Sequence, residues 1–306
     1  MLSGCGTALV TPFMDGAVDY EAYAVLVDRQ VAAGVDFLVP LATTGETPTL
    51  SAEEKLRLLD ITREHACGKP LLVGCGSNSI PGTLANIELL KGHGADSWLV
   101  VVPFYNKPTQ EGMFLYYKEL SRLIAADGVP VVIYNVPGRT GANMTAQTCL
   151  RIAREVPGIA GIKEASGKFD QVCEILEGAP EGFSVLSGDD DMTFSMMEKG
   201  AHGVISVASN VAPAVVSEMT HLMLQARARK ADPEHCSFDA EEMVREAAAL
   251  DASLQPLFKG CFVESNPIPA KAALSLMGLC TKEMRLPLTE ASDSTVELMK
   301  ELIQAF

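Results

Sequence analysis

A lysine stands inside an apolar run that has the length and composition of a buried strand. Lys163 lies in IAGIKEAS, residues 159–166. A buried ammonium group costs free energy unless a partner or a reaction uses it. Burial also favours the neutral amine, which can attack a carbonyl and form a Schiff base. The alternative is a structural lysine paired with Glu164 or Asp189, and the residue alone leaves both interpretations open.

Two phenols also stand where apolar runs end. Tyr105 closes SWLVVVPFYN and Tyr134 lies in PVVIYNVPG. Imine formation and aldol steps both need groups that shuttle protons, and a phenol can do this. A buried tyrosine taken alone is more often a core residue whose hydroxyl has a partner. The presence of two phenols in such positions, together with Lys163, favours the catalytic interpretation.

Two further segments could bind carboxylates. Thr43, Thr44 and Gly45 follow an apolar run, and their hydroxyl and backbone N–H groups could hold a carboxylate or an oxyanion. An ordinary Thr-Gly turn explains the same residues equally well. Arg139, in VPGRTG, could make a bidentate contact to a carboxylate, although a loop arginine is usually solvated.

Acidic residues and histidines do not form a metal motif in this sequence. Asp189, Asp190 and Asp191 are consecutive, and we interpret them as a charge cluster at a helix N-terminus. No cysteine pair has CxxC spacing, and no histidine lies at a ligand offset from such a pair. We therefore expect no metal site.

The elements that must position these residues alternate regularly. Short runs rich in Val, Ile and Leu are typical of parallel strands buried on both faces. They occupy residues 6–12, 37–45, 70–78, 97–106, 130–138, 159–166, 183–190 and 203–210. Eight such runs separated by amphipathic stretches predict a (β/α)8 TIM barrel, in which reactive groups lie at the carboxyl ends of the strands.

The helical stretches carry their own signals. Residues 20–34 end at a glycine, and Ser51 with Glu54 predicts a capping box at the start of a helix over 51–68. After about residue 225 the strand signal stops, and residues 240–258, 267–279 and 292–306 predict three helices. We therefore expect a catalytic barrel over 1–225 and a C-terminal helical subdomain over 226–306.

Composition excludes several classes of function. The chain has 306 residues, 24 Lys and Arg against 39 Asp and Glu, and a net charge of −15. This charge argues against nucleic acid or an anionic membrane as a partner. Several of the eight cysteines, such as Cys75 and Cys261, lie among apolar residues and predict free buried thiols. With no basic leader and no apolar run of about 18 residues, we expect a cytoplasmic protein.

The ordered motifs resemble one family. TALVTPF, TTGE, YNVPGRTG, GIKEASG, LSGDD, AHGVISV and FVESNPIPAK follow one another between residues 7 and 271. Together they resemble the dihydrodipicolinate synthase family, in the superfamily that includes N-acetylneuraminate lyase. The resemblance implies the condensation of pyruvate with L-aspartate 4-semialdehyde, for lysine and diaminopimelate synthesis. It also implies a homotetramer built as a dimer of dimers, without a cofactor.

The same resemblance implies a role for each candidate residue. Lys163 would form the imine, Tyr134 would relay protons, and Thr44 with Tyr105 would complete the relay, Tyr105 being contributed by the neighbouring subunit. The remaining implied contacts are those with the substrates. Thr43, Thr44 and the Gly45 backbone would bind the pyruvate carboxylate, Arg139 the carboxylate of the semialdehyde, and Gly188 and Ile205 would line the pocket through their backbone.

The sequence departs from the family pattern where lysine-inhibited members bind lysine. The pattern of those members has His, Glu and Tyr at the positions of Lys55, Gly82 and Phe104. Only Asn78 of this chain agrees with that pattern. We therefore expect weak or absent feedback inhibition by L-lysine.

Two other functions remain as alternatives at this stage. One is another pyruvate aldolase of the superfamily, such as N-acetylneuraminate lyase or a sugar-acid lyase, although Arg139 and Tyr105 argue against it. The other is a catalytically silent barrel that only binds a 2-oxo acid or a partner.

Overall fold

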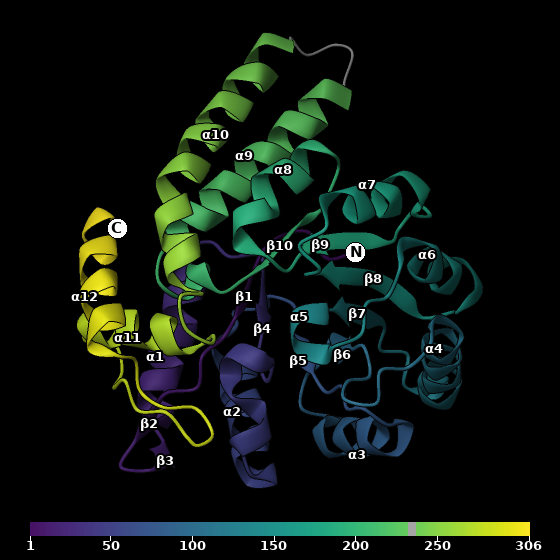
Figure 1. Cartoon of the computed structure of the whole chain (residues 1–306), viewed down its shortest axis with the longest axis horizontal. Helices are drawn as coiled ribbons and strands as arrows, with labels where there is room; N and C mark the ends of the chain where they lie inside the picture. Colours follow the sequence, from purple (N-terminus) through teal and green to yellow (C-terminus); the bar gives the residue numbers. More distant parts are fainter. Residues whose placement is uncertain (232–236) are drawn as a thin grey trace.

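Eight parallel strands form the centre of the molecule and alternate with helices along the chain (Figure 1). The computed structural model describes residues 1–231 and 237–306. The strand order is β4-β1-β10-β9-β8-β7-β6-β5, and a parallel bridge between Leu38 and Leu71 joins the two ends of the sheet. The barrel strands are β1 (Gly4–Ala8), β4 (Phe37–Val39), β5 (Leu72–Gly74), β6 (Ser97–Val101), β7 (Val131–Asn135), β8 (Ile159–Glu164), β9 (Ser184–Ser187) and β10 (Gly203–Ser206).

Seven of the predicted apolar runs contain one of these strands, and the run over 6–12 overlaps β1, which begins two residues earlier, so the predicted (β/α)8 barrel is confirmed. The strands are apolar throughout because both faces are buried. One face fills the barrel interior with side chains such as Phe37, Leu99, Val132 and Leu186. The other face packs under the surrounding helices in a larger apolar cluster.

The helices cover the outside of the barrel and extend beyond it. The α-helices are α1 (Tyr20–Ala32), α2 (Ala52–His65), α3 (Ile80–Leu90), α4 (Gln110–Ile124), α5 (Pro137–Thr140), α6 (Ala146–Glu155), α7 (Phe169–Gly178), α8 (Thr193–Glu198), α9 (Pro213–Ala231), α10 (Ser237–Gly260), α11 (Ile268–Leu276) and α12 (Asp293–Leu302). The 3-10 turns are η1 (Thr43–Gly45), η2 (Thr47–Thr49), η3 (Ala125–Asp127), η4 (Asp190–Met192), η5 (Ala208–Asn210) and η6 (Ile303–Ala305). The capping box predicted at Ser51 and Glu54 is confirmed, since each side chain accepts a hydrogen bond from the other residue's backbone N–H.

A small hairpin of β2 (Phe13–Met14) and β3 (Ala17–Val18) was not predicted. Its strands are too short to show a period of two. Its turn is Asp15-Gly16, and both residues have positive φ, 53° and 79°. An Asp-Gly pair is a strong signal for a two-residue hairpin turn. The turn residues therefore indicate this hairpin, although the two short strands do not.

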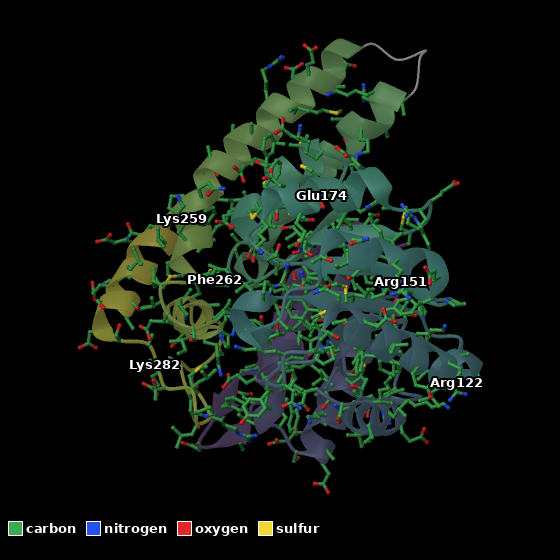
Figure 2. All side chains as sticks on the ribbon, turned by 45° about the vertical axis from the view of Figure 1, so that its right-hand side comes forward. Arg122, Arg151, Glu174, Lys259, Phe262 and Lys282 are labelled. Carbon is green, nitrogen blue, oxygen red and sulfur yellow. The ribbon has the colours of Figure 1, made fainter. Side chains whose placement is uncertain are left out.

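The three predicted C-terminal helices are present as α10, α11 and α12. Figure 1 shows α9 and α10 side by side, projecting away from the barrel, with α11 and α12 beside its N-terminal elements. The segment that joins α10 to α11 carries Phe262 at the surface (Figure 2). Residue 225 lies within α9, and the division into two units at that point stays a prediction.

Candidate functional site

The predicted site residues all follow, or lie near, the carboxyl ends of barrel strands. Thr43, Thr44 and Gly45 form η1 after β4, and Tyr105 follows β6. Tyr134 lies in β7, Arg139 in the short helix α5 after it, and Lys163 in β8. Gly188 follows β9, and Ile205 lies in β10. The parallel barrel therefore gathers residues that are up to 162 positions apart at one end.

Lys163 is buried and contacts a phenol. Its residue is 4% exposed, and its Nζ lies 4.4 Å from the centroid of the Tyr134 ring. The two residues are register partners on β7 and β8. Among residues 1–231 and 237–306, no carboxylate lies within ion-pair distance of this amine. The ion pair with Glu164 or Asp189 that the structural alternative requires is therefore not formed.

Glu164 is engaged elsewhere. Its carboxylate accepts hydrogen bonds from Asn135 Nδ2 at 3.0 Å and from the Ser166 N–H at 2.9 Å. Burial raises the pKa of this carboxyl above its usual value, and these hydrogen bonds oppose the rise. Glu164 therefore holds the end of β8 in place and does not pair with Lys163.

The acidic run after β9 does more than start a helix. Burial, followed by repulsion from Asp191, raises the pKa of Asp189 to about 6, and attraction to Lys163 opposes this rise. Asp190 is fully buried, and its Oδ2 accepts hydrogen bonds from the backbone N–H groups of Val207 and Ala208 at 2.9 and 3.0 Å. The expectation of a simple helix N-terminal charge cluster is thus incomplete, because Asp190 ties the loop after β10 to the loop after β9.

A cavity of about 430 Å³ opens beside Tyr134. Thr43 and Arg139 also line it, together with Lys55 and Phe104. Arg139 is exposed at the cavity mouth, where a guanidinium can meet an anionic ligand. Lys163, Thr44, Gly45, Gly188 and Ile205 are absent from the cavity lining within the described part of the chain. Tyr134 therefore lies between the cavity, which it lines, and Lys163, which its ring contacts.

The η1 turn is held firmly by its own hydrogen bonds. The Gly45 N–H donates to the Ala42 carbonyl at 3.1 Å, and the Gly45 carbonyl accepts from Thr11 Oγ1 at 2.8 Å. Thr44 is 2% exposed. The Gly45 N–H is thus turned into the loop, so the hydroxyls of the two threonines are the more available groups for a carboxylate.

Tyr105 stands apart from the other site residues. It is 85% exposed and has a positive φ of 75°. Its backbone N–H donates to the Thr140 carbonyl at 3.4 Å, which links the loop after β6 to α5. Among the hydrogen bonds of the described residues, none joins the Tyr105 hydroxyl to Tyr134 or Thr44. Among the described residues, hydrogen bonds therefore do not link Tyr134, Thr44 and Tyr105 into a relay within a single chain.

Gly188 and Ile205 contact the site in different ways. A Cβ added at Gly188 would lie 2.9 Å from Lys163 Cε and 2.7 Å from Ala165 Cβ. The glycine therefore leaves the space that the lysine side chain occupies. Ile205 is fully buried in the apolar cluster of the barrel interior, which also contains Tyr134.

Residues of the C-terminal segment reach the site, and the sequence analysis missed them. Asn266 Nδ2 donates to Thr44 Oγ1 at 2.9 Å, and Lys271 Nζ pairs with Glu46 Oε1 at 2.8 Å. The available signal was a lysine inside the apolar stretch IPAKAAL, the same signal that singled out Lys163.

In residues 1–231 and 237–306, no cluster of three His, Cys, Asp or Glu side chains is arranged to hold a metal ion. No helix within those ranges has the length and apolarity needed to cross a membrane.

Known proteins resemble this chain over nearly its whole length. The Dihydrodipicolinate synthetase family matches residues 1–306. The 4-hydroxy-tetrahydrodipicolinate synthase of Thermotoga neapolitana is 44% identical over 308 residues, covering 99% of this chain and 98% of the relative. That of Parabacteroides distasonis is 42% identical over 305 residues, covering 99% and 96%.

Solved structures agree with these relatives. The crystal structure of dihydrodipicolinate synthase from Thermotoga maritima superposes with a TM-score of 0.91 at 41% identity, covering 99% of this chain and 98% of that one. The 4-hydroxy-tetrahydrodipicolinate synthase of Methylacidiphilum fumariolicum superposes with a TM-score of 0.90 at 36% identity, covering 100% and 96%.

Proposed function

This chain belongs to the dihydrodipicolinate synthetase family, and we propose that Lys163 is the amine through which it acts on pyruvate. It is a lyase of the class I aldolase type. Its reaction condenses pyruvate with L-aspartate 4-semialdehyde to give 4-hydroxy-tetrahydrodipicolinate, in lysine and diaminopimelate biosynthesis.

The observation that carries the proposal is the position of the buried amine. Lys163 Nζ lies against Tyr134, and no carboxylate of the described residues pairs with it. A neutral amine attacks the ketone carbon of pyruvate, and loss of water gives an imine. Removal of a methyl proton then gives an enamine, whose carbon attacks the aldehyde of the second substrate. The protein itself thus supplies the electron sink.

Tyr134 is the proton shuttle in this proposal. Its ring contacts the amine and borders the cavity, so its hydroxyl can move protons during imine formation and aldol addition. Thr44 takes part in the same relay. Thr43 and Thr44 hold the pyruvate carboxylate through their hydroxyls, Gly45 shapes the turn that presents them, and Gly188 and Ile205 shape the space around the imine.

Arg139 recognises the second substrate in this scheme. It lies at the mouth of the cavity, and a bidentate guanidinium fits the carboxylate of a small acidic aldehyde. We expect Arg139→Ala to raise KM for the semialdehyde about 10- to 100-fold while KM for pyruvate stays nearly constant. Arg122→Ala is the matched control, because Arg122 lies at the surface on α4 (Figure 2) and pairs only with Glu119 of the same helix among the described residues. Equal KM values in parent and variant would remove Arg139 from the site.

The direct test of Lys163 is covalent trapping. Borohydride reduces an imine to a stable amine, so the parent with pyruvate should gain the mass of the reduced adduct at Lys163. Lys163→Ala should show neither the adduct nor turnover. Lys168→Ala, which removes an exposed lysine in the following loop, should keep both. Turnover by the Lys163→Ala protein at the parental rate would overturn the proposal.

The exposure of Tyr105 supports assembly into a homotetramer built as a dimer of dimers. A phenol that is 85% exposed in one chain can complete the relay in a neighbouring one. The test mixes two inactive variants, Tyr105→Phe and Lys163→Ala, under conditions of subunit exchange. Mixed dimers should regain one active site each, whereas no recovery after demonstrated exchange would place Tyr105 outside the relay.

A cytoplasmic location is also part of the proposal. Cys5, Cys75 and Cys261 are free and buried, which fits a reducing compartment; Cys236 lies outside the described residues. Fractionation of cells should recover the activity with cytoplasmic marker enzymes.

A further inference from the structure

A hydrogen bond joins the C-terminal segment to the proposed proton relay. Asn266 Nδ2 donates to Thr44 Oγ1 at 2.9 Å, between residues that are 222 positions apart. Asn266 is 5% exposed and Thr44 is 2% exposed, so water does not compete for this contact. The motif FVESNPIPAK, which contains Asn266, has no role in the function derived above.

A buried ion pair fastens the same two segments. Lys271 Nζ lies 2.8 Å from Glu46 Oε1, and both side chains are fully buried. Glu46 directly follows η1 and has a positive φ of 51°. Its Oε2 accepts from the Arg285 N–H at 3.2 Å, and Lys271 Nζ also lies 4.2 Å from the centroid of the Phe13 ring.

Burying the charges of Glu46 and Lys271 costs free energy, and the pair contributes fixed geometry in return. Burial lowers the pKa of the Lys271 ammonium, and attraction to Glu46 opposes this. A buried pair is weak support for stability, because apolar residues of similar size often do as well. It does fix geometry, since neither charge can move away from the other. Glu46 and Lys271 therefore hold η1 against the start of α11, where Asn266 lies.

The hydrogen bond from Asn266 decides whether the Thr44 hydroxyl is free to donate its proton. A hydroxyl has one proton to donate and two lone pairs that accept. Because the Asn266 N–H group occupies a lone pair of Thr44 Oγ1, the Thr44 proton stays free for another acceptor. Asn266 Oδ1 has no hydrogen-bond partner among the described residues, so it does not take that proton.

We propose that Asn266 is a positioning residue that fixes the direction of the Thr44 hydroxyl proton, and that the Glu46–Lys271 pair holds it in place. The inference rests on the proposed function, in which Thr44 handles a proton. It assigns the C-terminal segment a part in catalysis through Thr44, without contact with substrate.

The test is the nearly isosteric variant Asn266→Asp, whose carboxylate accepts but does not donate. It should draw the Thr44 proton toward itself and lower kcat about 100-fold, the lower range for a lost proton-transfer group. KM for pyruvate should change less than about threefold, and the pH profile of kcat should shift because a new ionisable group controls the relay. Ser265→Ala is the matched control, because Ser265 is the exposed neighbour, and it should leave all three quantities unchanged.

A double variant shows whether Asn266 acts through Thr44. Thr44→Val should itself lower kcat, and adding Asn266→Asp to it should lower kcat little further. Two losses that multiply would overturn the inference, and so would an Asn266→Asp enzyme with parental kcat and pH profile. If the aspartate variant does not fold, Asn266→Ala carries the same expectation for kcat.

The outcomes separate this inference from the function on which it rests. A Thr44→Val enzyme with full activity, or no borohydride adduct at Lys163, would overturn the proposed roles of those residues. An impaired Thr44→Val enzyme beside an unimpaired Asn266→Asp enzyme would overturn only the inference. The Glu46–Lys271 pair is tested by Glu46→Gln with Lys271→Met, which removes both charges together. In the folded protein kcat should fall, because the Thr44 hydroxyl is held less precisely. An unchanged kcat would remove the pair from the inference.

Discussion

Tyr134 and Lys163 are register partners on neighbouring parallel strands, and the lysine Nζ lies 4.4 Å from the centroid of the tyrosine ring. The pairing places an amine and a phenol on one face of the sheet, at its carboxyl end. Their backbones are fixed by the hydrogen-bonded ladder of β7 and β8, so the contact does not depend on a loop. A rigid sheet thus supplies the preorganisation that proton transfer needs.

Tyr134→Phe removes the hydroxyl and keeps the ring over Lys163. We expect kcat to fall about 100- to 10,000-fold, the range for loss of a general acid–base group, while the fold and the apolar contact survive. Tyr23→Phe is the control, because Tyr23 is a buried tyrosine of α1 whose hydroxyl lies 2.7 Å from Thr62 Oγ1, away from the site. Steady-state kinetics with both substrates measures the effect. A Tyr134→Phe enzyme within about threefold of the parent would contradict the shuttle role.

Feedback inhibition by L-lysine should be weak or absent. Lys55 and Phe104 both line the cavity, and Lys55 brings a positive charge that repels the amine of a lysine ligand. Gly82, on α3, offers no carboxylate in compensation. The measurement is the initial rate with both substrates over a series of L-lysine concentrations, with a check that the coupling enzyme is insensitive to lysine. Half-inhibition at sub-millimolar L-lysine would refute the prediction.

The barrel was predictable because its signals are local. A strand buried on both faces is apolar along its length, and Lys163 stood out because it interrupted such a run. The capping box at Ser51 and Glu54 spans only four residues. Each of these features can be found within a short window of sequence.

The connections between distant segments were not predictable in this way. Asn266 meets Thr44, and Lys271 meets Glu46, across more than 220 residues. Nothing near Glu46 indicates that its carboxylate is fully buried, because its partner comes from a helix outside the barrel. The exposure of Tyr105 in the single chain was likewise not evident from its apolar neighbours in sequence.

Asp189 makes the stability of the folded protein fall as the pH rises. Its pKa rises from 3.8 to about 6 on folding, mainly through burial. Between these values the folded state holds a proton that the unfolded state has lost. The contribution to stability is therefore full below the unfolded pKa and is lost as the pH rises through about 6.

Asp189→Asn removes this dependence. The variant should gain stability relative to the parent between about pH 4 and about pH 7.5. The gain has an upper limit of about 3 kcal/mol, from about 1.4 kcal/mol per pKa unit, and is smaller because the side chain is partly exposed. Thermal midpoints of both proteins across this range test the sign, with Asp170→Asn, an exposed aspartate of α7, as control. A difference between variant and parent that does not vary with pH would contradict it.

Gly188→Ala should disable imine formation without unfolding the barrel. The new methyl group would lie 2.9 Å from Lys163 Cε and 2.7 Å from Ala165 Cβ, closer than real Cβ contacts come. Ala165 directly follows β8, and its N–H is held by the Asn135 carbonyl, so the backbone at residue 188 must shift away from it. The flexible lysine side chain must also give way, and its Nζ must leave the face of Tyr134. We expect the borohydride adduct with pyruvate to fall at least about tenfold, with kcat falling in parallel because both require the same amine position. Gly112→Ala on α4, where the nearest atom to a new Cβ is 3.4 Å away, is the matched control and should keep the parental adduct yield. Full labelling of Lys163 in a folded Gly188→Ala protein would show that the imine forms without the space that the glycine provides.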